Sequence, residues 1–154
     1  MNIKTVIAYT DGSSIKAKGG GCHGGVGVVL LFNGRMKEIS HPIPDGTNNI
    51  SELTACILAL EALKEPCKVT LHTDSQYCIK SMTQWLSGWK SRGWMTANKG
   101  AVKNVDLIKR LDQLCQTHCV EWVWVKGHSG VFYNEKADEL ACKASASLKE
   151  NEIG

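Results

Sequence analysis

At 154 residues, with 43% hydrophobic and 21% charged residues, the chain has the length and composition of one globular domain. No stretch is apolar for long enough to cross a bilayer, and no signal peptide precedes the first predicted strand, so we expect a cytoplasmic protein without membrane contact. Seven cysteines, an odd number, predict reduced thiols rather than a disulfide framework.

Three predicted strands come first. Residues 3–10 are apolar on both alternating faces, as expected of a central strand that is covered on both sides. A second apolar run at residues 26–32 ends at Asn33-Gly34, which is a strong signal for a two-residue hairpin turn. The charges at residues 35–39 suit an edge strand, so this part of the chain predicts three antiparallel strands.

Helical patterns dominate the middle of the chain. We expect a helix from residue 47 to about 63, a strand at residues 69–73 and a helix at residues 75–86. The following residues 87–103 contain three glycines and many polar side chains, which predicts a protruding loop or a short helix.

The last third predicts one more strand between two helices. Asn104 is expected to cap the first helix, residues 120–125 form the strand, and Asn134 is expected to cap a helix that ends near residue 148. The whole order predicts a single α/β domain over residues 1–154, with fraying from about residue 149.

Positive charge is concentrated in one segment. Between residues 80 and 103 there are five basic side chains and no acidic one, and without them the net charge of +3 becomes −2. A basic face on a slightly acidic body is typical of a protein that binds a polyanion. The five are Lys80, Lys90, Arg92, Lys99 and Lys103.

Four acidic residues stand out by their local contexts. Asp11 and Asp74 follow two strands that a strand–helix–strand connection should make parallel and adjacent, so their carboxylates should meet at one edge of the sheet. The carboxyl ends of parallel strands are also where open α/β sheets bind ligands. Glu52 and Asp138 each head a row of apolar or small residues on a predicted helix, which points both side chains toward the sheet.

Each of the four has an ordinary explanation when it is taken alone. Asp11 and Asp74 suit turns, Glu52 suits the first turn of a helix, and Asp138 suits a solvated helix face. Together they predict a metal site, because clustered carboxylates repel one another unless cations neutralise them. Oxygen ligands favour Mg²⁺, with Mn²⁺ as a substitute, and two such ions can activate a water and stabilise a departing oxygen in phosphoryl chemistry.

The cysteines leave a zinc or redox site open as an alternative. Cys22-His23 and the group Cys115, His118 and Cys119 carry zinc-ligand types but not the paired spacing of a structural zinc site. Three others fall at apolar helical positions, where a free thiol is usually buried. They are Cys56, Cys78 and Cys142.

A series of motifs runs through nearly the whole chain: Tyr9-Thr-Asp-Gly-Ser, Thr47-Asn-Asn, Glu52-Leu, Thr73-Asp-Ser-Gln-Tyr, Asn104-Val-Asp-Leu, Trp124-Val-Lys-Gly-His-Ser-Gly and Asp138-Glu-Leu-Ala. In this order and spacing the chain resembles the type 1 ribonucleases H of the bacterial kind, the ribonuclease HI family. The resemblance implies a five-stranded mixed sheet, with three antiparallel strands followed by two parallel ones, flanked by helices.

The resemblance also implies a reaction and a catalytic site. The expected activity is sequence-nonspecific endonucleolytic hydrolysis of the RNA strand of RNA–DNA hybrids by a monomer, leaving 3′-hydroxyl and 5′-phosphate ends. By resemblance, two Mg²⁺ ions are held by Asp11, Glu52, Asp74 and Asp138. His128 matches a histidine that assists proton transfer or product departure.

Contacts to the hybrid follow from the same resemblance. Asn48, Asn49 and Gln76 match minor-groove positions, where amides can both donate to and accept from a 2′-hydroxyl, and Thr47 matches a DNA-phosphate pocket. The basic protrusion pairs aromatic rings with cations that suit phosphates. The remaining implied contacts are Trp85, Trp89, Lys90, Arg92, Trp94, Lys99 and Asn134.

Several of these residues also suit a structural role. Asn48 and Asn49 suit helix capping, and Trp85 and Trp89, one helical turn apart, suit a small core. Two further tryptophans, Trp122 and Trp124, alternate on a strand and are expected in the core.

The chain departs from the family pattern in two places. The loop after Asp11, residues 14–25, is longer than the usual Asn-Pro-Gly-type turn and carries two lysines and a histidine. Later, Val131-Phe132-Tyr133 replaces the usual His-Pro-Glu-like run, which affects the loop of His128.

Two functions from other classes stay open. One is a non-catalytic module that binds hybrids, although clustered carboxylates beside a polyanion serve no purpose in a pure binder. The other is a DNA nuclease of the integrase, transposase or resolvase kind, against which the Asn48-Asn49 pair and Gln76 argue.

Overall fold

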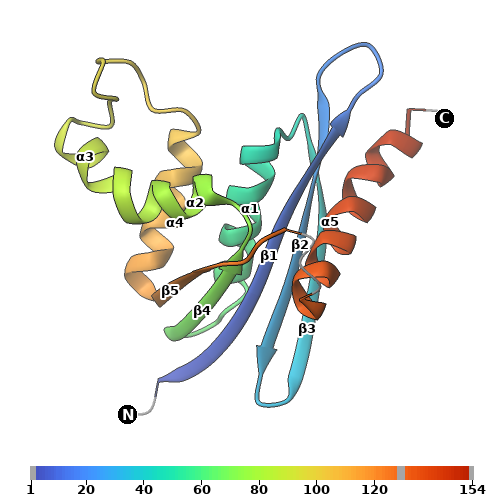
Figure 1. The fold of residues 1–154 in the computed structure, drawn as a ribbon, viewed down its shortest axis with the longest axis horizontal. Helices are drawn as coiled ribbons and strands as arrows, with labels where there is room; N and C mark the ends of the chain where they lie inside the picture. Colours follow the sequence, from blue (N-terminus) through green and yellow to red (C-terminus); the bar gives the residue numbers. More distant parts are fainter. Residues whose placement is uncertain (1–2, 128–130, 153–154) are drawn as a thin grey trace.

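A computed structural model describes residues 3–127 and 131–152, which form a five-stranded sheet with helices on both faces (Figure 1). In spatial order the strands are β3 (Arg35–Pro44), β2 (Cys22–Phe32), β1 (Lys4–Lys16), β4 (Cys67–Thr73) and β5 (Cys119–Trp124). The pairs β1–β2 and β2–β3 are antiparallel, whereas β1–β4 and β4–β5 are parallel. The predicted α/β fold is confirmed.

The helices divide between the two faces of the sheet. In the described chain they are α1 (Asn48–Glu61), α2 (Gln76–Lys80), the π-helical turn η1 (Ser81–Trp85), α3 (Leu86–Ser91), α4 (Val105–Thr117) and α5 (Phe132–Glu150). Figure 1 shows α5 on one face and α1 with α4 on the other. Within the described residues, no helix combines the length and the hydropathy needed to cross a membrane.

Local sequence signals set several of these boundaries. Asn33 and Gly34 both have positive φ, 49° and 74°, as the predicted two-residue hairpin requires. Thr47 caps α1, because its Oγ1 accepts a hydrogen bond from the Ile50 amide at 3.2 Å. Since Thr47 is the cap, the side chains of the next two asparagines are not needed for capping.

The β1–β2 hairpin is longer than predicted. The two strands stay paired from Ile7↔Leu31 as far as Lys16↔Cys22, so most of the loop expected at residues 14–25 is regular sheet and Asp11 lies inside β1. Glycines and polar side chains in this stretch hide the alternation that marks a strand. β3 likewise extends to Pro44, which an edge strand tolerates.

The second helix and its protrusion also differ from prediction. The helical path that begins at Gln76 continues through η1 to Ser91, and the irregular protrusion therefore starts later than residue 87. A single bridge, Met95↔Ala101, organises its turn. Figure 1 shows this protrusion and the β1–β2 hairpin projecting from the same end of the molecule.

Two predictions about the last helices were wrong in detail. Asn104 occupies the N-cap position just before α4, with φ 56°, but its side-chain amide donates to the Tyr77 hydroxyl at 3.2 Å instead of capping. α5 begins at Phe132, so Asn134 lies inside it and is buried. Lys149 lies in the last turn of α5, and its Nζ donates to the Lys16 carbonyl at 2.9 Å; fraying after about residue 149 stays a prediction.

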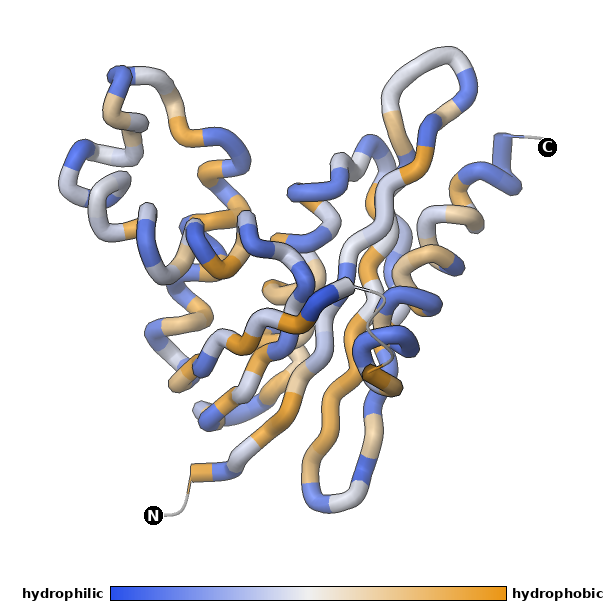
Figure 2. The backbone as a smooth tube through the Cα atoms, viewed as in Figure 1, coloured by the Kyte–Doolittle hydropathy of each residue, from blue (hydrophilic) through white to orange (hydrophobic). Residues whose placement is uncertain are grey.

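The main core fills the space between the sheet and the helices α1 and α4. Its fully buried large side chains include Leu53, Leu60, Leu71, Ile108 and Leu111. Figure 2 shows long hydrophobic stretches in the central strands, whereas the tip of the β1–β2 hairpin is polar. Burial of such aliphatic side chains stabilises the fold by about 1.5–3 kcal/mol each.

The α5 face is thinner, because the helix backbone touches the sheet. A Cβ added to Gly27 would meet the Ala137 carbonyl oxygen at 1.9 Å, and one added to Gly25 would meet the Ala141 carbonyl oxygen at 2.1 Å. Glycine is therefore required at both positions for its lack of a side chain. This contact fixes where α5 lies along the sheet.

Gly27→Ala should lower the free energy of unfolding by about 1–3 kcal/mol, the usual cost of overpacking a tight contact. Urea unfolding measures the change, and Gly100→Ala is the matched control because a Cβ there meets only the Thr96 hydroxyl, at 3.4 Å. Equal unfolding midpoints for the two variants would contradict the prediction.

Candidate active site

The site begins at a fork between two parallel strands. β1 and β4 pair as far as Thr10↔Thr73, after which β1 remains paired only with β2. Asp11 and Asp74 are the first residues beyond that last pair. Their carboxylates therefore meet where the strands diverge, as the strand–helix–strand connection predicted.

Glu52 enters the fork from α1. A Cβ added to Gly12 would meet the Glu52 backbone nitrogen at 2.4 Å, so the helix backbone rests directly on β1 at this glycine. One carboxylate oxygen from each of Asp11, Glu52 and Asp74 lies within 4.8 Å of the others. Three of the four predicted acidic residues thus form one compact group.

Asp138 approaches from the opposite face of the sheet, on α5. It is half-buried and close enough to Asp11 to raise the pKa of that carboxyl group, although it lies outside the compact group of three. All four carboxylates line one open pocket of about 380 Å³. The structure thus brings the four predicted acidic residues to the same pocket.

Burial and mutual repulsion strongly perturb two of these carboxyl groups. Asp11 is 4% exposed, and its burial, followed by the charge of Asp74 and the hydrogen bond with Asp138, raises its pKa from 3.8 to about 8. Burial and then the charges of Asp11 and Asp74 raise the pKa of Glu52 well above its ordinary value. Without cations, protons must take up part of the negative charge.

The residues fit a hard divalent cation. The Glu52 Oε1 atom is buried and has no hydrogen-bond partner among the described residues, which is unfavourable unless another ligand approaches it. An all-oxygen donor set of this kind suits Mg²⁺ or Mn²⁺ better than zinc. Asp11, Glu52 and Asp74 therefore form a candidate divalent-metal site.

The cysteines do not form a competing site. Among the described residues, the only cluster with metal-binding potential is the carboxylate group, and all seven cysteines are free. Cys56 and Cys78 are buried as predicted, but Cys142 is exposed. The reason is that α5 faces the sheet through its alanines, whereas Cys142 lies one turn after Asp138 on an exposed side of the helix, with its Sγ 3.8 Å from the Asp138 Oδ1.

Amide side chains surround the carboxylates. Asn48, Asn49 and Gln76 line the same pocket and are exposed, so their amides are available to a ligand. A second pocket of about 590 Å³ adjoins it, and the predicted Thr47 lines this one. Its far wall is formed by Lys103 and Asn104, which sequence reasoning did not place there because only the fold brings them next to α1.

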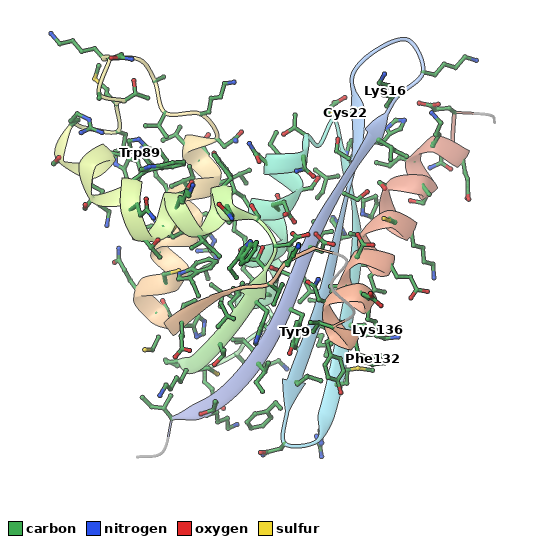
Figure 3. All side chains as sticks on the ribbon, in the orientation of Figure 1. Tyr9, Lys16, Cys22, Trp89, Phe132 and Lys136 are labelled. Carbon is green, nitrogen blue, oxygen red and sulfur yellow. The ribbon has the colours of Figure 1, made fainter. Side chains whose placement is uncertain are left out.

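Aromatic side chains of the protrusion are packed on one another. Trp85 is 40% exposed, and the centroid of its ring lies 5.8 Å from that of half-buried Trp89. This pair of rings therefore has one side toward the core and one side open to solvent. Trp94 is half-buried beneath the Lys109 ammonium, 5.2 Å from its ring. Figure 3 shows Trp89 well away from Lys16 on the hairpin.

Two of the predicted cations in the protrusion have internal partners. Lys90 forms an ion pair with Asp112 at 2.8 Å, and the Arg92 Nε donates to the Met95 carbonyl at 3.1 Å. Lys99, in contrast, is exposed, and the hydrogen bonds and ion pairs of the described residues include none from its ammonium group. The structure thus separates cations that hold the protrusion together from one that faces outward.

Of two further predicted residues, one falls outside the described part of the chain and the other is buried. His128 lies outside the described residues, although its neighbour Gly127 does not: a Cβ there would meet the Asp74 Oδ2 at 3.1 Å. Asn134 is 2% exposed, and its Oδ1 has no partner within the described chain. Its burial gives no support to a direct contact with nucleic acid.

Both departures from the family pattern have visible contacts. Glu152, just after α5, accepts hydrogen bonds from the Lys18 amide at 2.7 Å and from the ring of His23, which fastens the long hairpin to the end of the helix. At the start of α5, the ring of Tyr133 lies 5.5 Å from that of Tyr9 on β1. Residues 131–133, which depart from the family pattern, therefore help to hold the start of α5 on the sheet.

Comparison with known proteins fits this site and fold. The model of the RNase H family matches residues 3–146. The chain belongs to the ribonuclease H family. It is 51% identical to the ribonuclease H of Shewanella denitrificans over 150 residues, which cover 97% of this chain and 92% of the relative. The ribonuclease H of Francisella philomiragia is 54% identical over 143 residues, covering 93% and 92%.

Solved structures agree with the ribonuclease H assignment. LC9-RNase H1, described as a type 1 RNase H with the type 2 active-site motif, superposes with a TM-score of 0.85 at 32% identity, covering 96% of this chain and 74% of its own. The PFV RNase H domain gives 0.79 at 27% identity, covering 95% and 97%. The expected resemblance to type 1 ribonucleases H is confirmed, and the chain is a nuclease of the hydrolase class.

Asp11→Asn should stabilise the metal-free protein at high pH. Because the pKa of Asp11 is raised, the folded protein keeps a proton that the unfolded chain releases, so the free energy of unfolding falls as the pH rises from about 4 to about 8. In EDTA above pH 8, the free energy of unfolding of the variant should be about 1–3 kcal/mol larger than that of the unmodified protein.

Urea unfolding across this pH range, with and without Mg²⁺, measures the effect. Mg²⁺ should remove the advantage of the variant, and Asp45→Asn, at an exposed turn position with φ 60°, is the control. Parallel pH profiles for the unmodified protein and Asp11→Asn would rule out the assigned pKa.

Proposed function

We propose that this protein hydrolyses the RNA strand of RNA–DNA hybrids as a sequence-nonspecific endonuclease, leaving 3′-hydroxyl and 5′-phosphate ends. The observation that carries the proposal is the pocket in which four carboxylates lie beside Asn48, Asn49 and Gln76. The carboxylates suit metal-assisted phosphoryl chemistry, and the amides suit a ribose.

The four carboxylates are proposed to be the catalytic ligands. Asp11, Glu52, Asp74 and Asp138 would hold two Mg²⁺ ions, for which Mn²⁺ can substitute. When bound, such ions lower the pKa of an attacking water and stabilise the leaving oxygen of an in-line displacement. The chain itself keeps Asp11 and Glu52 out of bulk water, which strengthens their hold on a cation.

Preference for RNA is proposed to come from the amides at the mouth of the pocket. Asn48 and Asn49 project from the first turn of α1 and Gln76 from the first turn of α2, on either side of the carboxylates. An amide can donate to and accept from the 2′-hydroxyl that DNA lacks. These contacts read the sugar and not the base, which explains the expected lack of sequence preference.

Phosphate contacts would then orient the duplex. The pocket formed by Thr47, Lys103 and Asn104 combines a hydroxyl, an ammonium and an amide, which together suit a phosphate of the DNA strand. Lys99 and the open side of Trp85 are placed to meet the backbone farther along, while Trp89, Lys90, Arg92 and Trp94 shape the protrusion.

His128 keeps its proposed role in proton transfer or product departure. Support comes from its neighbour Gly127, whose backbone lies against Asp74 and so brings this part of the chain to the carboxylates. We further propose that residues 1–154 act as one ribonuclease H domain and as a monomer, which sedimentation at working concentration would test.

Cleavage of an end-labelled RNA–DNA hybrid in Mg²⁺ tests the proposal. We expect cuts in the RNA strand only, absence of activity in EDTA, and a loss on the order of 10²- to 10³-fold in Asp74→Asn, comparable to removal of one charge-stabilising group from a hydrolase site. Duplex DNA, duplex RNA and single-stranded RNA should resist. Hybrid binding without cleavage would favour the binding module, and cleavage of duplex DNA would favour an integrase-like nuclease.

A second experiment tests the 2′-hydroxyl contacts. A hybrid with a single 2′-deoxynucleotide, moved along the RNA strand, should raise the KM of the unmodified protein at one or two positions. In Asn49→Ala, the 2′-deoxy substitution at the same position should no longer raise KM. The double-mutant cycle of the two changes should give a coupling energy of about 0.5–3 kcal/mol. Gln113→Ala, an exposed amide on α4, should retain the sensitivity, and additivity in Asn49→Ala would refute the contact.

A further inference from the structure

Trp124 is exposed where the strand pattern predicted core. It is the last residue of edge strand β5, and 49% of its surface is accessible. Trp122, two residues earlier and on the same face, is half-buried and packs against the main core. The core therefore ends between these two tryptophans, and the second indole extends past it.

An open hollow of about 250 Å³ lies beside this indole. Its other walls come from the helical segment that follows Asp74, namely Gln76, Ile79, Lys80 and Gln84. Gln76 also lines the pocket of the four carboxylates. The two hollows thus share one side chain as their common wall.

The lining of the hollow suits a nucleotide. It offers an indole ring, one ammonium group and two amides, and it contains no acidic side chain. Within the described residues, the polar groups of Gln76, Lys80 and Gln84 make no hydrogen bond or ion pair, so they are available to a ligand. Indole rings accept bases or sugars of any sequence, and an ammonium group accepts a phosphate.

We propose that this hollow is a further nucleotide subsite, in which Trp124 packs on a nucleotide that flanks the reacting one and Lys80 meets its phosphate. The subsite rests on the proposed function, since it extends the path of the hybrid beyond Gln76. Packing on Ile79 alone does not require a side chain as large as tryptophan at this exposed end of an edge strand. The proposed subsite gives Trp124 a binding role.

Steady-state cleavage of a hybrid substrate is the first test. Trp124→Ala should raise KM about 5-fold or more, while kcat stays within about twofold, as expected for loss of one stacked nucleotide away from the reacting atoms. Trp124→Phe should recover much of the loss because it keeps a ring. Met36→Ala, which removes a 49% exposed apolar side chain from edge strand β3, should leave KM unchanged.

Fluorescence gives a readout that a merely structural tryptophan would not affect. In the Asp74→Asn background, 2-aminopurine is placed at successive positions of the hybrid and its emission is measured on binding. We expect quenching at one or two adjacent positions, lost on addition of Trp124→Ala and kept with Met36→Ala. For Lys80→Ala, the slope of log affinity against log salt should fall by about 1, whereas Lys68→Ala, at the opposite end of β4, should leave it unchanged.

The outcomes separate the subsite from the proposed function. Failure of the unmodified protein to cut hybrids would overturn the proposed function itself. Normal cutting with an unchanged KM and unchanged quenching in Trp124→Ala would overturn only the subsite. A lower melting temperature of Trp124→Ala with unchanged KM would show that the indole is structural, and would overturn the subsite as well.

Discussion

Repulsion among three carboxylates, held within 4.8 Å of one another, is the constraint on which the rest of the structure depends. Such a group does not assemble by itself, because each negative charge raises the free energy of ionising the next. The fold must therefore supply the energy of assembly from elsewhere. It does so with a large aliphatic core directly beneath the fork, on the α1–α4 face of the sheet.

β1 carries this constraint at two consecutive residues. Gly12 receives the backbone of α1, which delivers Glu52, while Asp11 is paired with Gly27, which receives the backbone of α5 and brings Asp138 near. Because side chains alternate along a strand, neighbouring positions can serve opposite faces. One strand thus aligns two helices that lie on opposite faces of the sheet, and the carboxylates converge where β1 and β4 diverge.

Sequence reasoning succeeded where a rule of connection applied and failed where only packing decides. The meeting of Asp11 with Asp74 follows from the handed strand–helix–strand crossover, and the Asn33-Gly34 turn follows from backbone conformation. The exposure of Trp124 could not be predicted, because alternation along a strand does not show where the covering helices stop. Nor could Lys103 be placed beside Thr47, since that contact spans more than fifty residues of chain and exists only after folding.

The close packing of the α5 backbone on two glycines of β2 also determines what holds this helix in place. Its carbonyl groups rest on Gly25 and Gly27, and contacts of Tyr133 and Lys149 hold its two ends. The sheet recognises α5 by shape, much as a protein surface recognises a docked peptide. Cutting the polypeptide between β5 and α5 would then leave two fragments that can reassemble, with Asp138 delivered in trans.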